Sequence, residues 1–288
     1  MAILKTEGLT YIYGTGTPFE KKALDNVNVE IQSGEIAGII GHTGSGKSTL
    51  VQHFNGLLRP SSGKVYFNGE DIWKDKKVPH DLRFEIGLVF QYPEYQIFEE
   101  TVFKDIAYGP KNMKLDEKSV DERVRQTAQM LQIPDSMLSR SPFELSGGQK
   151  RRVAIAGVMA MRPKVLILDE PTAGLDPRGR DTILGLIKNY NRETGCTVLI
   201  VSHSMEDMAR FADKLLVMNK SRLFCYDEVS AVFSKADEIS DMGLSVPQIT
   251  RVFNSLKKSG YDLGEEIYTV KYAAKKVLEY LNKEGDLS

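Results

Sequence analysis

The stretch that decides the fold is Gly41-His42-Thr43-Gly44-Ser45-Gly46-Lys47-Ser48, which fits the pattern G-x-x-x-x-G-K-[ST]. An apolar run precedes it and leucines at helical spacing follow it, so we expect a strand, a glycine loop and a helix. This context argues against the alternative, a glycine-rich turn that binds no ligand. Three glycines let successive N–H groups face inward towards an anion, and the helix adds its positive dipole end. The stretch predicts a phosphate site in which Lys47 reaches the β- and γ-phosphates and Ser48 ligates Mg²⁺.

Composition narrows the class of protein. The chain has 288 residues, of which 41% are hydrophobic, which suits one large α/β domain with or without a small second one. A net charge of −1 argues against a general nucleic-acid binder. Cys196 and Cys225 are too few for a zinc module or a disulfide framework, so we expect both to be reduced in a cytosolic fold. No signal peptide or membrane span is predicted, so any membrane role requires docking to another protein.

The first segment has the pattern of antiparallel strands. Apolar residues alternate with polar ones over 27–31, and Val65 and Phe67 alternate before Asn68-Gly69, which is a hairpin signal. Tyr13 precedes a turn rich in glycine and threonine. Its ring is either a tyrosine of the core or rim, or a platform for an adenine, and spacing alone does not choose between them.

Polar residues follow three buried strands. Gln91 ends the strand that begins at Ile86, Asp169-Glu170 end the run from Val165, and His203 follows the run 197–201. Parallel strands end at one edge of a sheet, where ligands bind. We assign Asp169 to the metal and Glu170 to the attacking water, while Gln91 and His203 are placed to touch the metal, the water or the γ-phosphate. The alternatives are a solvated strand end for Gln91 and a structural role for His203.

A second glycine-containing helix start lies at Leu145-Ser146-Gly147-Gly148-Gln149. An ordinary helix capped by Ser146 is one interpretation. However, two glycines weaken a helix start, and Lys150, Arg151 and Arg152 oppose its dipole. We therefore expect this start to expose backbone N–H groups and positive charge to an anion.

The remaining segments are mainly helical. Residues 101–138 include a predicted helix at 120–131, and another follows at 182–190. Beyond residue 213 there is a strand at 215–218 and then two amphipathic helices around 249–256 and 270–281. Their apolar stripes either cap the first domain or pack against a second subunit.

In this order, the motifs resemble those of ATP-binding-cassette (ABC) ATPases, over about residues 1–225. Four stretches narrow the resemblance to the ATP-binding subunits of energy-coupling-factor (ECF) transporters, which are related to cobalt transport ATPases: Tyr11–Leu24 with Gly16–Glu20, Gly41–Leu50, Ser146–Gly157 and Gly243–Pro247. The resemblance implies an α/β fold with a mixed sheet core, an antiparallel β subdomain, a helical subdomain and a small α-rich C-terminal domain. It places the ABC nucleotide-binding domain at 1–225, with the helical subdomain at about 92–160. The C-terminal domain would span 226–288 and is a possible dimerisation domain.

The resemblance also implies a role for each matching residue. The ATP-binding residues would be Tyr13, Gly41, His42, Thr43, Gly44, Ser45, Gly46, Lys47, Ser48 and Thr49. The catalytic residues would be Glu170, His203 and Gln91, and the Mg²⁺ ligands Ser48, Gln91 and Asp169. The signature Leu145, Ser146, Gly147, Gly148 and Gln149 would contact the ATP of a partner subunit, next to a D-loop of Ala173, Gly174, Leu175 and Asp176.

The implied assembly has several parts. Two ATPases would form a head-to-tail dimer on the cytoplasmic face of a transmembrane scaffold. We favour two paralogues as its subunits because of Gly16–Glu20. A separate membrane protein would capture a vitamin or metal ion. Glu94, Glu99 and Glu100 would receive basic residues of the scaffold, unless they form a solvated acidic loop.

The pattern departs from the family after the strand at 215–218, where Asn219–Arg222 and Cys225–Glu228 replace the usual glycine turn and Gly-Thr/Ser-Pro.

An ATPase of a cobalt or nickel importer is the alternative function. A DNA-repair ABC ATPase would need a longer insertion before Leu145, a translation-associated one usually has two cassettes, and a regulator without activity would lack Glu170 or His203.

Overall fold

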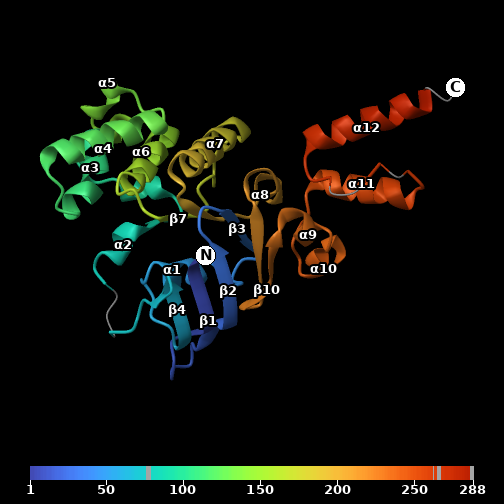
Figure 1. The fold of residues 1–288 in the computed structure, drawn as a ribbon, viewed down its shortest axis with the longest axis horizontal. Coiled ribbons are helices and arrows are strands. Elements are labelled where there is room, and N and C mark those ends of the chain that lie inside the picture. The colour runs from blue at the N-terminus through green and yellow to red at the C-terminus, as the bar shows by residue number, and fades with distance from the viewer. Residues whose placement is uncertain (76–78, 262, 265–266, 286–288) are drawn as a thin grey trace.

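The computed structural model describes residues 1–75, 79–261, 263–264 and 267–285 (Figure 1). Its centre is a six-stranded sheet in the order β10-β9-β3-β8-β7-β6. The five strands from β9 to β6 are parallel, and β10 is antiparallel to β9. The strands are β3 (Ile36–Gly41), β6 (Ile86–Val89), β7 (Val165–Asp169), β8 (Thr197–Val201), β9 (Lys214–Asn219) and β10 (Arg222–Glu228). Every residue of β3, β7 and β8 is buried, as their continuous apolar runs require.

A second, antiparallel sheet has the order β2-β1-β4-β5. Its strands are β1 (Ala2–Tyr13), β2 (Lys21–Gln32), β4 (Ser62–Phe67) and β5 (Glu70–Asp71). The predicted hairpin at Asn68-Gly69 is confirmed, since both residues have positive φ and Phe67 pairs with Glu70. The mixed core sheet and the antiparallel sheet agree with the predicted fold class.

Helices between β6 and β7 form a group at the upper left of Figure 1. They are the 3-10 turns η1 (Pro93–Gln96) and η2 (Pro142–Glu144) and the helices α3 (Val102–Asn112), α4 (Glu117–Met130), α5 (Asp135–Leu138) and α6 (Gly147–Met159). The helix predicted at 120–131 begins three residues earlier, because the Asp116 carboxylate accepts a hydrogen bond from the Ser119 N–H.

The other helices of the first 225 residues are α1 (Lys47–Phe54), α2 (Leu82–Glu85), α7 (Pro177–Thr194) and α8 (Met205–Phe211). Helix α7 is longer than the predicted 182–190. Pro177 occupies its first position behind the cap Asp176, and Gly195 ends it with φ of 69°. These are sequence signals for a helix start and a helix end that the apolar spacing alone does not contain.

Two hydrophobic clusters cover the two faces of the core sheet. Ile36 and Ile40 of β3 belong to the cluster that includes the helices α3 to α7, whereas Ala37 and Ile39 belong to the cluster with α1 and the antiparallel sheet. Alternating residues of one strand therefore bind both layers together. This packing fixes the position of the loop that follows β3.

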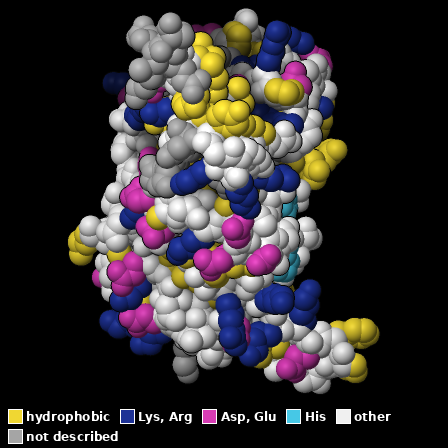
Figure 2. All heavy atoms as spheres, turned by 90° about the vertical axis from the view of Figure 1, so that its right-hand side faces the viewer, with side chains coloured by type: hydrophobic (Ala, Val, Ile, Leu, Met, Phe, Trp, Pro, Cys, Tyr) yellow, Lys and Arg dark blue, Asp and Glu magenta, His cyan; other side chains and the backbone are white. Residues whose placement is uncertain are grey.

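The C-terminal region contains α9 (Val229–Phe233), α10 (Ala236–Asp241), α11 (Gln248–Lys258) and α12 (Val270–Gly285). Phe253, Ile267 and Ala273 form a small cluster of their own. Other stripe residues stay in solvent, and Figure 2, which views this end of the molecule, shows hydrophobic side chains gathered near its top. The exposed ones are Val252, Val270, Leu278 and Leu281. The expected boundary at residue 225 falls inside β10, and the domain limits stay a prediction.

None of the helices in the described ranges is long and apolar enough to cross a bilayer.

His53 on α1 makes stability depend on pH. The residue is fully buried, its Nδ1 lies 2.7 Å from the Thr49 carbonyl oxygen, and Nε2 has no partner. Burial lowers the pKa of His53 below the ordinary value. Below pH about 6.5 the unfolded chain binds a proton that the folded chain refuses, so the free energy of unfolding falls by up to about 1.4 kcal/mol per pH unit.

We therefore expect the melting temperature to fall less in the His53→Leu variant than in the wild type when the pH is lowered from 7.5 to 5.0. The matched control is His80→Leu, because the side chain of His80 is exposed. Thermal unfolding at both pH values measures the effect. Equal losses in wild type and His53→Leu would contradict it.

Candidate active site

The phosphate loop closes around its own lysine. Lys47 is the first residue of α1, and its Nζ donates to the carbonyl oxygens of Gly41 at 2.8 Å and His42 at 3.1 Å. Gly46 has φ of 107°, and a Cβ atom there would lie 2.5 Å from the Ala23 carbonyl oxygen, so only glycine fits. Burial lowers the pKa of Lys47, which is compensated in part by the charges of Glu170 and Asp169. A bound anion would give this ammonium a stronger partner than two carbonyl oxygens.

The β9–β10 turn supports the loop from the side. Its central residues, Lys220 and Ser221, have φ of 45° and 70°, so they adopt the left-handed conformation that the family usually gives to glycine. The Lys220 N–H donates to His42 Nε2 at 3.3 Å, and the Ser221 N–H donates to the Ser45 carbonyl oxygen at 3.2 Å. The sequence departure therefore keeps the turn geometry and brings it into contact with the phosphate loop.

The carboxylates lie beside the loop at the carboxyl edge of the sheet. Asp169 is the last residue of β7 and pairs with Val201 of β8, whose carbonyl oxygen accepts the Glu170 N–H at 3.0 Å. Glu170 then leaves the strand with φ of 53°. His203 Nε2 lies 3.1 Å from Glu170 Oε1. The structure thus brings together Lys47, Asp169, Glu170 and His203, as the strand ends predict.

Burial tunes the protonation of these groups. It raises the pKa of Glu170 to about 7, with a further contribution from the negative charge of Asp169. It also raises the pKa of Asp169, against a hydrogen bond from Ser48, and lowers the pKa of His203. A carboxylate with a pKa near 7 is well suited to take a proton from water at neutral pH.

We expect kcat/KM for ATP hydrolysis to fall about tenfold per pH unit below pH about 7, because kcat/KM reports the pKa of a base in the free enzyme. The measurement is steady-state ATPase activity between pH 5.5 and pH 9. The residual activity of Glu170→Gln, recorded over the same range, corrects for the titration of ATP itself. A flat corrected profile down to pH 5.5 would rule out Glu170 as the base.

A cavity of about 160 Å³ adjoins the loop. Tyr13, Lys21 and Gly44 line it together with the start of α1. The Tyr13 hydroxyl lies 3.3 Å from Thr49 Oγ1, and the ring makes an edge-to-face contact with Tyr11. With 40% of its surface exposed, Tyr13 is a rim residue whose ring is available for an adenine. The two alternatives for Tyr13 are therefore compatible.

The signature Leu145–Gln149 combines both interpretations of its sequence. Ser146 is the N-cap of α6 and forms a capping box with Gln149, which accounts for both side chains. Gly147 and Gly148 are exposed, and a Cβ atom on either would meet no atom within 4 Å. Leu145 is buried and anchors the start. The Gln149 N–H is thus bonded to the cap, whereas Gly147 and Gly148 lie exposed with open space above them.

The expectation that the arginines of this start face an anion is wrong. Arg151 is buried and its guanidinium bonds Glu94, and Arg152 donates to the Gln132 carbonyl oxygen. Glu94 is likewise not free to receive a scaffold residue, so that prediction is wrong for Glu94, while for Glu99 and Glu100 it stays a prediction. The sequence did place Arg151 near the first turn of a helix, where a cation opposes the helix dipole and so needs an acceptor. The sequence did not say that this acceptor is Glu94, 57 positions away.

Gln91 and the D-loop take peripheral positions. Gln91 lies two residues beyond β6, and its side chain is exposed at the same edge of the sheet as Asp169. Asp176 caps α7 by accepting the Gly179 N–H at 2.7 Å, Leu175 is half-buried against the core, and Ala173 and Gly174 form the preceding turn. The roles assigned to all these residues stay predictions.

The residues around the carboxylates fit a magnesium ion. The Ser48 hydroxyl lies close enough to Asp169 to lower the pKa of that carboxyl, so a hydroxyl and a carboxylate are neighbours at this edge. Mg²⁺ prefers such oxygen ligands, usually one or two from protein together with substrate phosphates and water.

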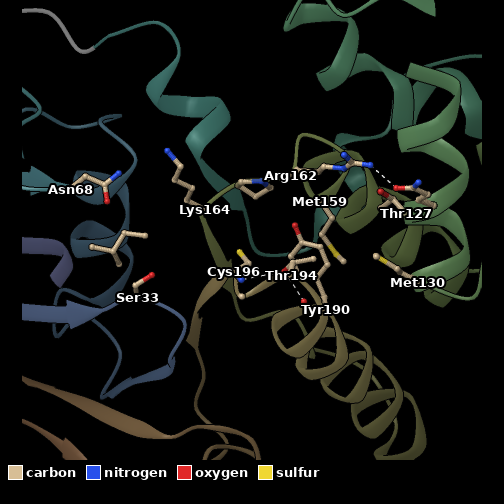
Figure 3. A pocket seen from close by; sticks show the side chains of 14 residues that line it. Ser33, Asn68, Thr127, Met130, Met159, Arg162, Lys164, Tyr190, Thr194 and Cys196 are labelled. Carbon is tan, nitrogen blue, oxygen red and sulfur yellow. Dashed lines mark hydrogen bonds between the residues drawn. The ribbon is translucent and has the colours of Figure 1, made fainter. Parts of the chain in front are cut away.

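A further cavity of about 440 Å³ lies at the opposite, amino-terminal edge of the parallel strands (Figure 3). Its cations are occupied within the chain, Arg162 by Gln126 and Lys164 by Glu85. Cys196 lines it, and burial raises the pKa of that thiol to about 12, so the thiol is not reactive. We assign this cavity no ligand.

Comparison with known proteins is consistent with this site. The family model described as ABC transporter matches residues 24–173. The chain is 55% identical over 280 residues to a protein of Clostridium acetobutylicum and 52% identical over 283 residues to one of Clostridium tetani, covering 96% and 98% of this chain and 98% of each relative. Both relatives are named energy-coupling factor transporter ATP-binding protein EcfA2.

Solved structures agree with the sequence relatives. The structure of cbiO1 from Clostridium perfringens, described as part of the ABC transporter complex cbiONQ, superposes with a TM-score of 0.75 at 40% identity, covering 88% of this chain and 99% of that one. A dimeric post-hydrolysis state of the ATP-binding cassette MJ0796 with ADP and Pi gives 0.68 at 28% identity, covering 78% and 98%.

The resemblance drawn from the motifs is confirmed by these matches, and the two sequence relatives span almost the whole chain. A phosphate loop, a buried pair of carboxylates and a neighbouring histidine at one sheet edge are the parts that hydrolysis of a nucleoside triphosphate requires. The chain is therefore an ATPase that belongs to the energy-coupling factor transporter ATP-binding proteins of the ABC transporter family.

Proposed function

We propose that this ATPase works as one half of a dimer docked on a transmembrane scaffold, at the cytoplasmic face of the membrane, and energises uptake of vitamins or other micronutrients. The observation that carries the proposal is the exposed helix start at Ser146–Gly148, with open space above both glycines. Within one protomer this helix start has no phosphate to face. The site is therefore complete only when a second ATPase supplies the phosphates of the nucleotide that it binds. We favour a paralogue as that second subunit.

The residues have distinct tasks in this proposal. Lys47 exchanges the carbonyl oxygens of Gly41 and His42 for the β- and γ-phosphates. Ser48, Asp169 and Gln91 would hold Mg²⁺, and the ion would neutralise charge on the phosphates. Glu170 accepts the proton of the attacking water, and His203, 3.1 Å from Glu170, orients that water.

A groove of about 300 Å³ in the helical group supports docking of a membrane partner. Phe98, Tyr108 and Met161 give it an apolar lining, and Asp105 adds a carboxylate whose pKa is raised by burial. Phe98 and Tyr108 meet edge to face and are both about half exposed. Asp105 accepts the N–H groups of Phe98 and Glu99, and Arg83 is a second charged residue of the lining. The exposed rings suit an apolar helix, and acidic residues beside the groove suit a basic residue on that helix.

Charge reversal beside this groove tests the docking. Glu99 borders the groove through its N–H, which donates to Asp105, and Glu100 is exposed and pairs with Lys104. We expect Glu99→Lys with Glu100→Lys to lower transport about tenfold or more while leaving ATP affinity unchanged, because reversed charges repel a basic partner.

The matched control is Glu117→Lys, an exposed charge at the start of α4. Transport of radiolabelled substrate and binding of ATP are measured on the same preparations. Wild-type transport in the double variant would exclude this contact and favour a solvated acidic loop.

Membrane extraction tests the assembly as a whole. The tagged chain, isolated from detergent-solubilised membranes, should bring with it a hydrophobic membrane protein and a second ATPase. Recovery of the chain alone, or with a soluble partner only, would contradict the proposal. The second candidate is the alternative drawn from the motifs, an ATPase of a cobalt or nickel importer, and the identity of the transported solute separates the two.

A further inference from the structure

One arginine joins three segments that the proposed cycle must move together. The buried guanidinium of Arg151, the fifth residue of α6, donates to Glu94 through Nε at 3.0 Å and Nη2 at 2.6 Å. Its Nη1 donates to the carbonyl oxygens of Ala173 at 2.6 Å and Pro171 at 3.3 Å. Glu94 belongs to η1, and Pro171 follows Glu170 directly.

The geometry suits a rigid joint. A guanidinium is planar and holds its donors in a fixed fork, so the bidentate pair with Glu94 sets the direction in which Nη1 points. The Ala173 carbonyl oxygen lies in that direction, in the turn between Glu170 and α7. Both partners of the ion pair are shielded from solvent, with 4% and 15% of their side chains exposed. A displacement of any one segment therefore breaks bonds to the other two.

The three segments lie at three functional places of the site. The turn η1 ends at Gln96, which lines the groove together with nearby Phe98. Helix α6 begins within the signature, and the loop at 171–173 follows the carboxylate that would polarise water. The sequence separates Arg151 from these partners by 57 positions on one side and by 20 to 22 on the other.

We propose that Arg151 is the positioning residue that couples the docking groove to the catalytic carboxylate and the signature helix. Movement of η1 by a docked membrane partner pulls on the guanidinium, which shifts the loop after Glu170 and the start of α6 as one body. Arg151 does not touch ATP. It acts through the placement of Glu170, so its loss lowers turnover and leaves nucleotide binding at the phosphate loop intact. This inference rests on the proposed docking of the chain to a membrane partner.

Three variants separate positioning from simple structural support. Arg151→Met leaves Glu94 buried without a partner, which should lower the melting temperature by about 5–10 °C. The double variant Arg151→Met with Glu94→Leu replaces the buried pair by apolar side chains, a change that restores stability in comparable cases. Arg151→Lys keeps the charge beside Glu94 but cannot reach the acceptors in η1 and in the loop at 171–173 at once.

The measurements are the melting temperature, the Kd of a non-hydrolysable ATP analogue, and kcat of the complex extracted from membranes. We expect all three variants to keep Kd within about twofold and to lose about 10- to 100-fold in kcat, the scale of a 1 Å misplacement. In the double variant the melting temperature recovers and kcat does not. The matched control is Arg152→Met, since Arg152 bonds Gln132 within the helical group, and its kcat should stay at the wild-type value.

Recovery of kcat together with melting temperature in the double variant would overturn the inference, because Arg151 would then only stabilise the fold. Wild-type kcat in Arg151→Lys, or a rise in Kd as large as the loss of kcat, would overturn it as well. An extracted wild-type chain that brings no membrane protein would instead refute the proposed docking, so the two failures are distinguishable.

Discussion

The Glu170→Gln variant should bind ATP with wild-type affinity and lose about 10²- to 10⁴-fold in turnover, which is the contribution of a positioned general base. Glutamine has the shape of the carboxylate and keeps the contact with His203, which lies 3.1 Å from Glu170 Oε1. It cannot accept a proton from water at neutral pH. Because hydrolysis is what would release the two subunits from each other, the closed dimer should accumulate with ATP present.

The measurement combines steady-state ATPase activity, ATP binding and size-exclusion chromatography. Glu144→Gln is the matched control, since Glu144 is an exposed glutamate close to the signature that pairs with surface Arg140. Normal steady-state turnover in Glu170→Gln would refute the assignment of the water-polarising role. Loss of ATP binding would show instead that the carboxylate supports the nucleotide site.

The Lys47→Ala variant should lose tight ATP binding. The ammonium is buried at the centre of the loop, and in the absence of nucleotide it bonds two loop carbonyl oxygens. Two charge-assisted hydrogen bonds to phosphates, at about 1.5–3 kcal/mol each, together stabilise the complex by about 3–6 kcal/mol. Their loss raises Kd by about 10²- to 10⁴-fold.

Isothermal titration with Mg-ATP measures the change, and Lys118→Ala, an exposed lysine on α4, is the matched control. The melting temperature of Lys47→Ala should stay near that of the wild type or rise slightly, because the variant no longer buries an ammonium group. A Kd within threefold of the wild type would contradict the phosphate-binding role of Lys47.

The sequence alone was sufficient to predict most of the candidate site. Gly41–Ser48, Asp169-Glu170 and His203 each follow an apolar run, and parallel strands of one sheet must end at one edge. Local chemistry explains why this works. A glycine loop, a strand and an N-cap are encoded by neighbouring residues, so the prediction needs no knowledge of distant contacts.

Contacts between residues far apart in the chain could not be predicted from the sequence. Arg151 looked like a cation offered to an anion, and Glu94 like a free acid on a loop, and each prediction failed because the other residue was its partner. Asn219–Arg222 looked like a departure from the family's glycine turn, yet Lys220 and Ser221 adopt the glycine-like conformation and contact the phosphate loop. Nothing in a pattern of single residues encodes a contact across 57 or 178 positions.

The sequence by itself determined the elements, the order of the motifs and the chemistry of the residues at the strand ends, because these depend on periodicity and on side-chain type. Only the tertiary structure decided that a pKa of about 7 arises at Glu170, that Lys47 rests on its own loop, and that Arg151 links three segments. The physical reason is that burial and hydrogen-bond geometry are properties of the packed chain. They appear only when distant residues exclude water from one another.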